Sequence, residues 1–330
     1  LLVIDEAGML DQDTARALMT IADEMDVRVA FVGDRHQLPA VGRGGVLDHA
    51  LRWAPPEGQV ALETVHRFDD PHYAELTLHM RTGDRAEAVF DALLDSGLIV
   101  IHGSEVERSS ALADAGVRGE TVIAERLETV ASLNLAIQDQ LHVPDPERHH
   151  ELAAIGSKGA IYVGDRVATR RNDRGLDVAN RDTWTVVSGN GRSGLVVTDG
   201  RRTRDLPVGY VRDHVELAYA TTVHGAQGET VDCAHFALDE GTTAAAGYVA
   251  MTRGRHTNTA HLVADDREAA RTQWVDAFHH QRADLGPEAA RDQAAEDIDY
   301  YGPLASPRRS RQVPPPVPLH RPEVPRGIGR

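Results

Sequence analysis

Two acidic residues, Asp5 and Glu6, follow directly after an apolar run at the start of the chain. Carboxylates at the end of a buried strand lie at the carboxyl edge of a parallel sheet, where open α/β sheets bind their ligands. There Asp5 would hold Mg²⁺ through water, and Glu6 would polarise an attacking water as general base. A strand followed by a polar turn explains the pair about equally well when it is considered alone.

A second polar loop, residues 33–39, follows the next apolar run. Gly33 permits a tight turn and Pro39 stiffens the loop, so Gln37 is expected at the same sheet edge as the acidic pair. An amide at that place can sense a terminal phosphate. The presence of two strand-end motifs at this spacing makes an ordinary loop the weaker explanation.

Two arginines in later segments suit a phosphate clamp, because a guanidinium is rigid and always charged. Arg67 ends the segment 63–67, and Arg253 follows an apolar run and a threonine in the segment 248–255. For Arg67 considered alone, a surface salt bridge is the better explanation. For Arg253, the apolar residues before it in the sequence favour the phosphate role.

The segment 220–229 offers hydrogen-bonding groups that carry no net charge, namely Thr222, His224 and Gln227. Such groups suit contacts to the backbone of a single strand that is released on every cycle. Gly228 lets the backbone approach a phosphate. A single histidine is more often a core or surface group, so the role of His224 depends on the motif around it.

Three further arginines stand close together in the segment 164–173: Arg166, Arg170 and Arg171. They suit a groove that tracks phosphates. A solvated basic face explains them nearly as well.

The elements that must position these residues follow from the hydrophobic pattern. Residues 1–4 and 27–32 are short apolar runs, and a helical stripe from Ala17 to Met25 separates them. Strand, helix and strand with buried strands form a parallel α/β unit. Residues 74–141 are mainly helical around a strand at 122–124, and α/β character returns at residues 217–263.

A different pattern interrupts this α/β character. Residues 161–215 are rich in Gly, Val, Thr and Arg, with strand-like runs at 166–169, 183–187 and 195–197. We interpret them as a small β insertion. Residues 306–330 are rich in Pro and Arg and cannot bury enough surface to offset their chain entropy, which predicts a disordered tail.

Composition excludes several classes of protein. A chain of 330 residues with 41% hydrophobic residues predicts two domains and a remainder, and a net charge of −16 argues against a protein that coats DNA through overall basicity. The single Cys233 fits a reducing cytoplasm, and no apolar run approaches the roughly 20 residues of a membrane span. The histidines show no spacing for a transition-metal site.

The motifs, in this order, resemble those of superfamily 1 DNA helicases of the RecD/TraI branch. Segments 1–8, 32–42, 63–67, 220–229 and 248–255 resemble motifs II, III, IV, V and VI. The likeness is greatest to the helicase portion of actinobacterial conjugative relaxases of the TrwC/TraI (MobF) type and covers residues 1 to about 290. In the insertion the family pattern usually continues with Asn-Gly, whereas this chain has Asn180-Arg181-Asp182.

The resemblance implies RecA-like P-loop NTPase lobes with parallel sheets and a small β-barrel insertion lying against DNA. We expect the end of the first lobe at 1–70, the second lobe at 71–155 and 216–277, the insertion at 156–215, and a helical remnant with a disordered tail at 278–330. It implies ATP and Mg²⁺ as cofactors. Glu6, Gln37, Arg67 and Arg253 would be catalytic, and Asp5, Gly33, Gly228 and Glu229 would bind the nucleotide.

The expected function is ATP-driven 5′-to-3′ translocation on single-stranded DNA during plasmid transfer, with conjugation machinery proteins as further partners. A RecD-like repair helicase and an ATPase-inactive DNA-binding remnant remain alternatives. No Gly-Lys-Ser/Thr loop precedes Asp5, and Lys158 is the only lysine. We therefore expect a piece of a longer protein that does not hydrolyse ATP alone.

Overall fold

The computed structural model describes residues 1–62, 65–142, 153–154, 160–190 and 192–279. Lys158 and the predicted disordered tail lie outside the described residues. Among the described helices, none has both the length and the apolar character that crossing a membrane requires.

The first α/β unit has the predicted order of strand, helix and strand. Strands β1 (Leu2–Ile4) and β2 (Val29–Phe31) pair in parallel and flank helix α1 (Gln12–Glu24). Asp11 caps the start of this helix, because its carboxylate accepts hydrogen bonds from the first-turn amides. A short 3-10 turn, η1 (Ala7–Met9), follows β1. Helix α2 (Val46–Trp53) and the 3-10 turn η2 (Pro56–Gly58) come after β2.

These two strands are less buried than the sequence predicts. Val3 is 55% exposed, and Ile21 and Met25 around the end of α1 are also exposed. The physical reason is that β1 and β2 form a sheet of two strands in the described chain, so apolar side chains have little to pack against.

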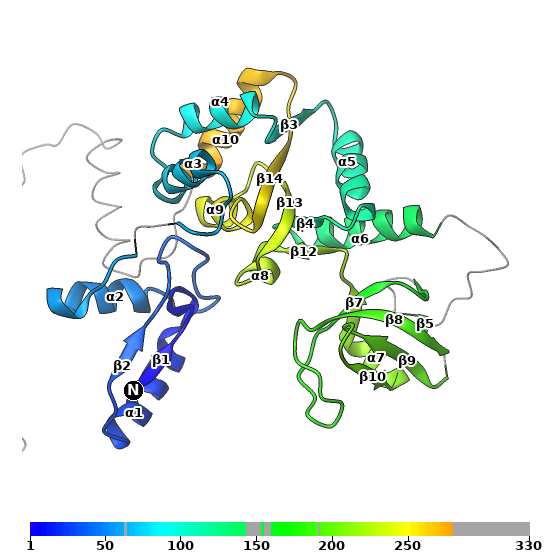
Figure 1. Cartoon of the computed structure of the whole chain (residues 1–330), viewed down its shortest axis with the longest axis horizontal. Coiled ribbons are helices and arrows are strands. Elements are labelled where there is room, and N and C mark those ends of the chain that lie inside the picture. The colour runs from blue at the N-terminus through cyan, green and yellow to red at the C-terminus, as the bar shows by residue number, and fades with distance from the viewer. Residues whose placement is uncertain (63–64, 143–152, 155–159, 191, 280–330) are drawn as a thin grey trace, which may run out of the picture. The chain divides into compact units, whose positions relative to one another are not determined.

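A second, larger sheet is parallel throughout, in the order β12-β4-β13-β14-β3 (Figure 1). Its strands are β3 (Ile99–His102), β4 (Thr121–Ala124), β12 (Ala220–Thr222), β13 (Val231–Ala237) and β14 (Gly254–Val263). The mixed α/β fold with a parallel sheet is thus confirmed.

Helices cover both faces of this sheet, as its apolar strands require. Helices α3 (Pro71–Thr82), α4 (Ala86–Asp95), α9 (Ala244–Ala250) and α10 (Arg267–His279) pack on one face, and α5 (Glu105–Val117) and α6 (Leu127–Leu141) on the other. Neighbouring residues of β4 serve opposite faces: Ile123 joins the first core, and Val122 joins the second.

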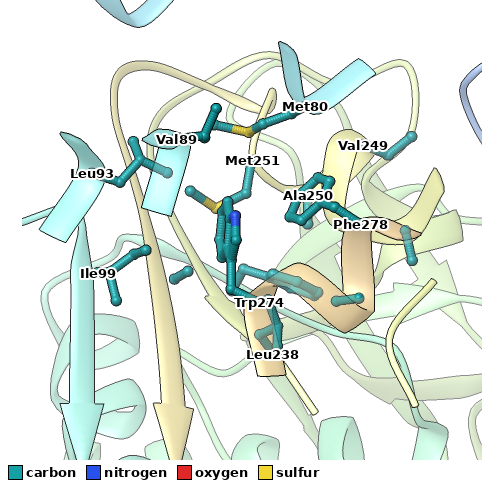
Figure 2. Close-up of a cluster of buried hydrophobic side chains, with 14 of the residues drawn as sticks. Met80, Val89, Leu93, Ile99, Leu238, Val249, Ala250, Met251, Trp274 and Phe278 are labelled. Atoms are coloured by element: carbon teal, nitrogen blue, oxygen red, sulfur yellow. The ribbon is translucent and has the colours of Figure 1, made fainter. Parts of the chain in front are cut away.

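The core beneath α3, α4, α9 and α10 is the largest in the chain's described part. Figure 2 shows Trp274 and Phe278 of α10 together with Met80 of α3, Val89 of α4 and Met251, which follows α9. Trp274 and Met251 are fully buried. The end of α9 and Met251 after it belong to this core. Their packing fixes the position of the residues that follow, including Arg253.

An antiparallel sheet interrupts the second α/β unit in sequence. Its order is β10-β9-β8-β7-β11, with β7 (Arg166–Thr169), β8 (Thr183–Asn190), β9 (Gly194–Thr198), β10 (Thr203–Leu206) and β11 (Val215–Leu217). Helix α7 (Val208–His214) and the pair β5 (Ala153–Ala154) and β6 (Ala160–Ile161) accompany it.

This antiparallel sheet has a core of its own. Trp184 and Val186 of β8 point inward with Val197 and Val211, whereas Thr185 between them in the alternating pattern is exposed. The predicted strands at 166–169, 183–187 and 195–197 all lie within strands of this sheet.

Candidate functional site

The loops that follow β1 and β2 pack backbone against backbone. The amide of Ala7 donates to the carbonyl oxygen of Val32 at 2.9 Å. A Cβ atom on Gly33 would lie 2.8 Å from the nitrogen of Ala7, and one on Gly8 would lie 2.9 Å from the carbonyl oxygen of Asp34. Only glycine permits this approach, so Gly33 is needed for packing between the loops.

Glu6 leaves β1 in the left-handed conformation, with φ of 51°. L residues with a Cβ adopt this region at a cost, so the surrounding structure must hold it. Asp5 is exposed, and its Oδ1 accepts a hydrogen bond from the amide of Glu6 at 2.9 Å. The two carboxylates predicted to act together therefore leave the strand in different backbone conformations.

Gln227 joins three of the predicted motifs at one point. Its Nε2 donates to Glu6 Oε2 at 3.2 Å and lies 3.4 Å from Gln37 Oε1. Its own Oε1 is buried without a hydrogen-bond partner in the described part of the chain. A Cβ atom on Gly228, where φ is +83°, would lie 4.0 Å from Glu6 Oε1.

The structure also brings Arg67 and Arg253 together. Arg253 is 1% exposed, and its guanidinium donates to the carbonyl oxygen of Val249 at 2.8 Å, to Thr252 Oγ1 at 3.0 Å and to the carbonyl oxygen of Glu229 at 3.3 Å. Arg67 Nη1 donates to the carbonyl oxygen of Thr252.

These two arginines influence one another electrostatically. Burial and then the nearby charge of Arg67 lower the pKa of Arg253, and Glu6 opposes the change, so that the pKa is about 10. Burial also lowers the pKa of Arg67, opposed by Tyr248 and Glu6. Arg253 also senses the charge of Glu229. Two neighbouring guanidiniums, one of them buried, suit an anionic ligand.

A network that the sequence did not predict ties the loop after β2 to α3 and α9. Tyr248 donates from its hydroxyl to Asp34 Oδ2 at 3.2 Å, and Arg81 donates to Asp34 Oδ1 at 3.2 Å. Burial raises the pKa of Tyr248 to about 12, so it remains a donor. The position of Asp34 after a strand was the only sequence signal for a role of this residue. No local sequence pattern indicated that Tyr248 and Arg81 would be its partners.

Of the remaining predicted residues in the 220–229 segment, Thr222 has a structural role. Thr222 caps the short helix α8 (Val223–Ala226), since its Oγ1 accepts from the amide of Gly225 at 3.0 Å. Burial lowers the pKa of His224, with a further lowering from Arg181. The Glu229 side chain is exposed.

The three predicted arginines of the antiparallel sheet do not form one group. Arg170 pairs with Glu216, and Arg171 Nη1 lies 3.3 Å from His214 Nε2. Arg166 and Arg170 line a pocket between this sheet and the 220–229 segment, and Arg171 is not among its lining residues. Arg181, for which no role was predicted from the sequence, also lines it.

Comparisons with known proteins agree with the motifs. A family model described as "AAA domain" matches residues 1–104. The RecBCD enzyme subunit RecD of Mycolicibacterium smegmatis is 28% identical over 247 residues, covering 70% of this chain and 43% of the relative. The multifunctional conjugation protein TraI of Escherichia coli K12 is 32% identical over 128 residues, covering 36% of this chain and 7% of the relative. The chain thus spans less than half the length of these relatives.

The fold is similar to that of a solved helicase. A Bacteroides Pif1 helicase, determined in complex with ADP-AlF3 and single-stranded DNA, gives a TM-score of 0.57 at 18% identity. The likeness covers 92% of this chain and 76% of that one. At this identity the comparison shows the fold, which is that of the helicase lobes.

Proposed function

Because the chain is related to superfamily 1 helicases of the RecD/TraI branch, as its motifs predicted, we propose that it carries motifs II to VI of an ATP-driven single-stranded-DNA translocase. The observation that carries this proposal is the meeting of Gln227 with Glu6 and Gln37. Residues of motifs II, III and V thereby share one site. In the intact protein the activity would be 5′-to-3′ unwinding during conjugative transfer, with conjugation machinery proteins as further partners.

Each catalytic role is supported by position. Glu6 faces the arginine pair and would act as general base on the attacking water. Gln37, held beside Gln227, would sense the terminal phosphate. Arg67 and Arg253 would stabilise charge on the transferring phosphoryl group, because guanidiniums buried beside one another favour an anion between them.

The residues present suit ATP and Mg²⁺. The neighbouring guanidiniums of Arg67 and Arg253, together with the unpartnered Oε1 of Gln227, fit a polyphosphate with bound water. Asp5 supplies one exposed carboxylate, and Mg²⁺ is commonly held by one or two carboxylates together with substrate phosphates. Bound there, Mg²⁺ would neutralise charge on the phosphates. Gly33, Gly228 and Glu229 are the other residues that we propose for the nucleotide site.

The proposed domains follow the sheets. Residues 1–70 would end the first RecA-like lobe, and residues 71–155 and 216–277 would form the second, interrupted by a barrel at 156–215. The split is supported by the antiparallel sheet, whose strands fall between β4 and β12 of the parallel sheet in sequence. Residues 278–330 would be a helical remnant and tail. DNA would contact Thr222, His224, Gln227, Arg166, Arg170 and Arg171.

The test is single-stranded-DNA-stimulated ATP hydrolysis. It compares this chain with a fusion in which an amino-terminal segment carrying the phosphate-binding loop of a RecD relative precedes residue 1. We expect turnover only in the fusion, because backbone amides and a lysine of that loop hold the phosphates. Glu6→Gln in the fusion should slow turnover by about 100-fold or more and leave nucleotide binding intact.

The matched control is Glu57→Gln, which removes an exposed carboxylate from the turn η2. It should leave turnover unchanged. A fusion that hydrolyses ATP equally fast with Glu6→Gln would rule out the proposed base. Turnover by this chain without the added loop would rule out the need for it.

A RecD-like repair helicase is the second candidate. The match to RecD covers 70% of this chain, a share similar to the 77% covered by the conjugal transfer protein TraA of Agrobacterium fabrum. The two candidates share the motor and differ in what accompanies it. Sequencing the coding region upstream of residue 1 separates them, since a conjugative protein would encode a relaxase domain there.

A further inference from the structure

Arg181, between β7 and β8, has a backbone conformation that is unfavourable for its residue type. Its φ is 74°, in the left-handed region where glycine is preferred. The backbone is held there by hydrogen bonds on both sides: Arg181 N donates to the carbonyl oxygen of Thr169 at 2.7 Å, and Asn180 N donates to Asn172 Oδ1 at 2.7 Å. Strain that a fold maintains in this way is a common mark of a functional position.

The side chain of Arg181 reaches out of its own sheet. Its Nη1 donates to the carbonyl oxygen of His224, a residue 43 positions away in the 220–229 segment. A carbonyl oxygen accepts a hydrogen bond but does not neutralise a guanidinium. In the part of the chain that the structure describes, no carboxylate forms an ion pair with Arg181.

The guanidinium also lines the pocket between the antiparallel sheet and the 220–229 segment. Its wall includes two further arginines, Arg166 and Arg170, and the threonines Thr183 and Thr221. Glu216 pairs with Arg170 and so offsets that charge. Arg166 has no ion-pair partner among the residues described, and Glu229 is the remaining acid on the wall.

We propose that this pocket binds a backbone phosphate of single-stranded DNA and that Arg181, with Arg166, is the cation that holds it. The proposal rests on the proposed function and names residues of its DNA site. Two unpaired guanidiniums and threonine hydroxyls are the groups that contact phosphates without reading bases. The pocket would therefore bind without sequence preference.

The position of Arg181 gives the pocket a second consequence. One end of the short helix α8 meets Arg181 through His224, and the residue after its other end, Gln227, contacts Glu6. A phosphate drawn to Arg181 would thus act on the element that contacts the proposed general base.

The experiment uses the 330-residue chain and a fluorescein-labelled oligothymidylate, with affinity measured by anisotropy at several salt concentrations. Arg181→Gly removes the cation and places the residue preferred at positive φ. We expect a melting temperature equal to or above that of the parent, a loss of affinity of about tenfold, and a salt slope smaller by about 0.7, the value for one phosphate contact on a single strand.

Three further variants complete the test. Arg181→Asn, whose side chain also tolerates positive φ, and Arg166→Gln should behave like Arg181→Gly. Arg174→Ala is the matched control, because Arg174 is exposed in the same part of the chain but does not line the pocket. It should keep the parent's affinity and slope.

The outcomes separate this inference from the function on which it rests. The pocket alone would be overturned if the parent chain binds the oligonucleotide and both Arg181→Gly and Arg166→Gln keep the parent's affinity and salt slope. Parent chain that does not bind would overturn the pocket together with the proposed DNA-binding function. Equal losses for Arg181→Gly and Arg174→Ala would show a diffuse charge effect and would also overturn the pocket.

Discussion

Arg253 illustrates how one side chain can serve the fold and the proposed site together. Its motif predicts a phosphate contact, whereas the structure shows three of its hydrogen bonds made to Val249, Thr252 and Glu229. A guanidinium has five N–H donors, so among the residues that the structure describes two are left for a ligand. The hydrogen bonds that fix the group in place therefore also aim it, which lowers the entropy lost when a phosphate binds.

Replacing Arg253 should for this reason affect stability as well as turnover. We expect Arg253→Ala to lower the free energy of unfolding by about 2–4 kcal/mol, because buried acceptors lose a charged donor and a cavity is left. Arg255→Ala, at an exposed position two residues away, should change it by less than about 0.5 kcal/mol. Urea unfolding measures both, and equal values for the two variants would contradict the packing role.

The surroundings of Gln227 differ from those that its predicted role requires. The sequence favours a DNA contact, but the side chain lies against Glu6 and Gln37 at the proposed hydrolytic site. Its DNA role stays a prediction. An amide between a carboxylate and another amide can exchange hydrogen-bond partners without moving a charge. This suits a residue that would respond to both the nucleotide and single-stranded DNA.

At the scale of elements, the spacing between the loops after β1 and β2 depends on glycine. The Cβ of alanine at position 33 would come within 2.8 Å of a backbone nitrogen, an approach that real Cβ atoms do not make. Since Glu6 and Gln37 lie on these two loops, their separation is set by this contact between backbones and not by their side chains.

Gly33→Ala should therefore move the loops apart. We expect a loss of about 1–3 kcal/mol in unfolding free energy, the usual cost of inserting atoms into a packed region. The control Gly42→Ala adds the same atom in an ordinary contact of 3.5 Å with Asp11 Cβ and should be nearly neutral. Urea unfolding of both variants measures the two changes in unfolding free energy. An unchanged unfolding free energy for Gly33→Ala would show that the loops can adjust to the added atom.

At the scale of the whole molecule, stability is linked to pH through histidines that cross the parallel sheet. His102 Nε2 lies 3.0 Å from His261 Nδ1, and His261 Nε2 lies 2.9 Å from His235 Nδ1. His235 Nε2 in turn lies 2.9 Å from Glu120 Oε2. Burial lowers the pKa of all three histidines, and for His261, which also senses its two neighbours and Arg108, the pKa falls to about 3.

These lowered pKa values predict the direction of the effect. The folded chain binds fewer protons than the unfolded chain, whose histidines titrate near 6.5, so stability is complete above about pH 6.5 and falls as pH decreases toward 3. Between pH 7.5 and 5.5, His261 alone should reduce the unfolding free energy by about 1.4 kcal/mol.

The measurement is urea unfolding at both pH values for the parent, His261→Gln and His72→Gln. His261→Gln should show a smaller difference between the two pH values, whatever its absolute stability. His72 is exposed, so His72→Gln should keep the parent's difference. An unchanged pH dependence in His261→Gln would show that another group is responsible.

The molecule as a whole carries a net charge of −16, so any DNA contact depends on local charge. Arg166 and Arg181 provide such a place, and their positive charge is not offset by ion pairs in the described residues. Few contacts imply a shallow salt dependence, which distinguishes this protein from one that coats DNA.

The sequence by itself determined the elements and the motif order. Apolar runs and a helical stripe predicted the parallel unit at β1, α1 and β2, and the Gly-, Val- and Thr-rich stretch predicted the antiparallel strands. These signals are local, since strand and helix periodicities and turn residues act over a few positions. Motif residues such as Glu6 and Arg253 were identified in the same way.

Only the tertiary structure decided which of these residues meet. Gln227 reaches Glu6 across 221 positions, and Arg181 reaches His224 across 43. Arg170 and Arg171, neighbours in sequence, instead have separate partners, Glu216 and His214. Such contacts depend on how sheets and loops pack against one another, and no local propensity encodes them, because each partner belongs to an element that is specified elsewhere in the chain.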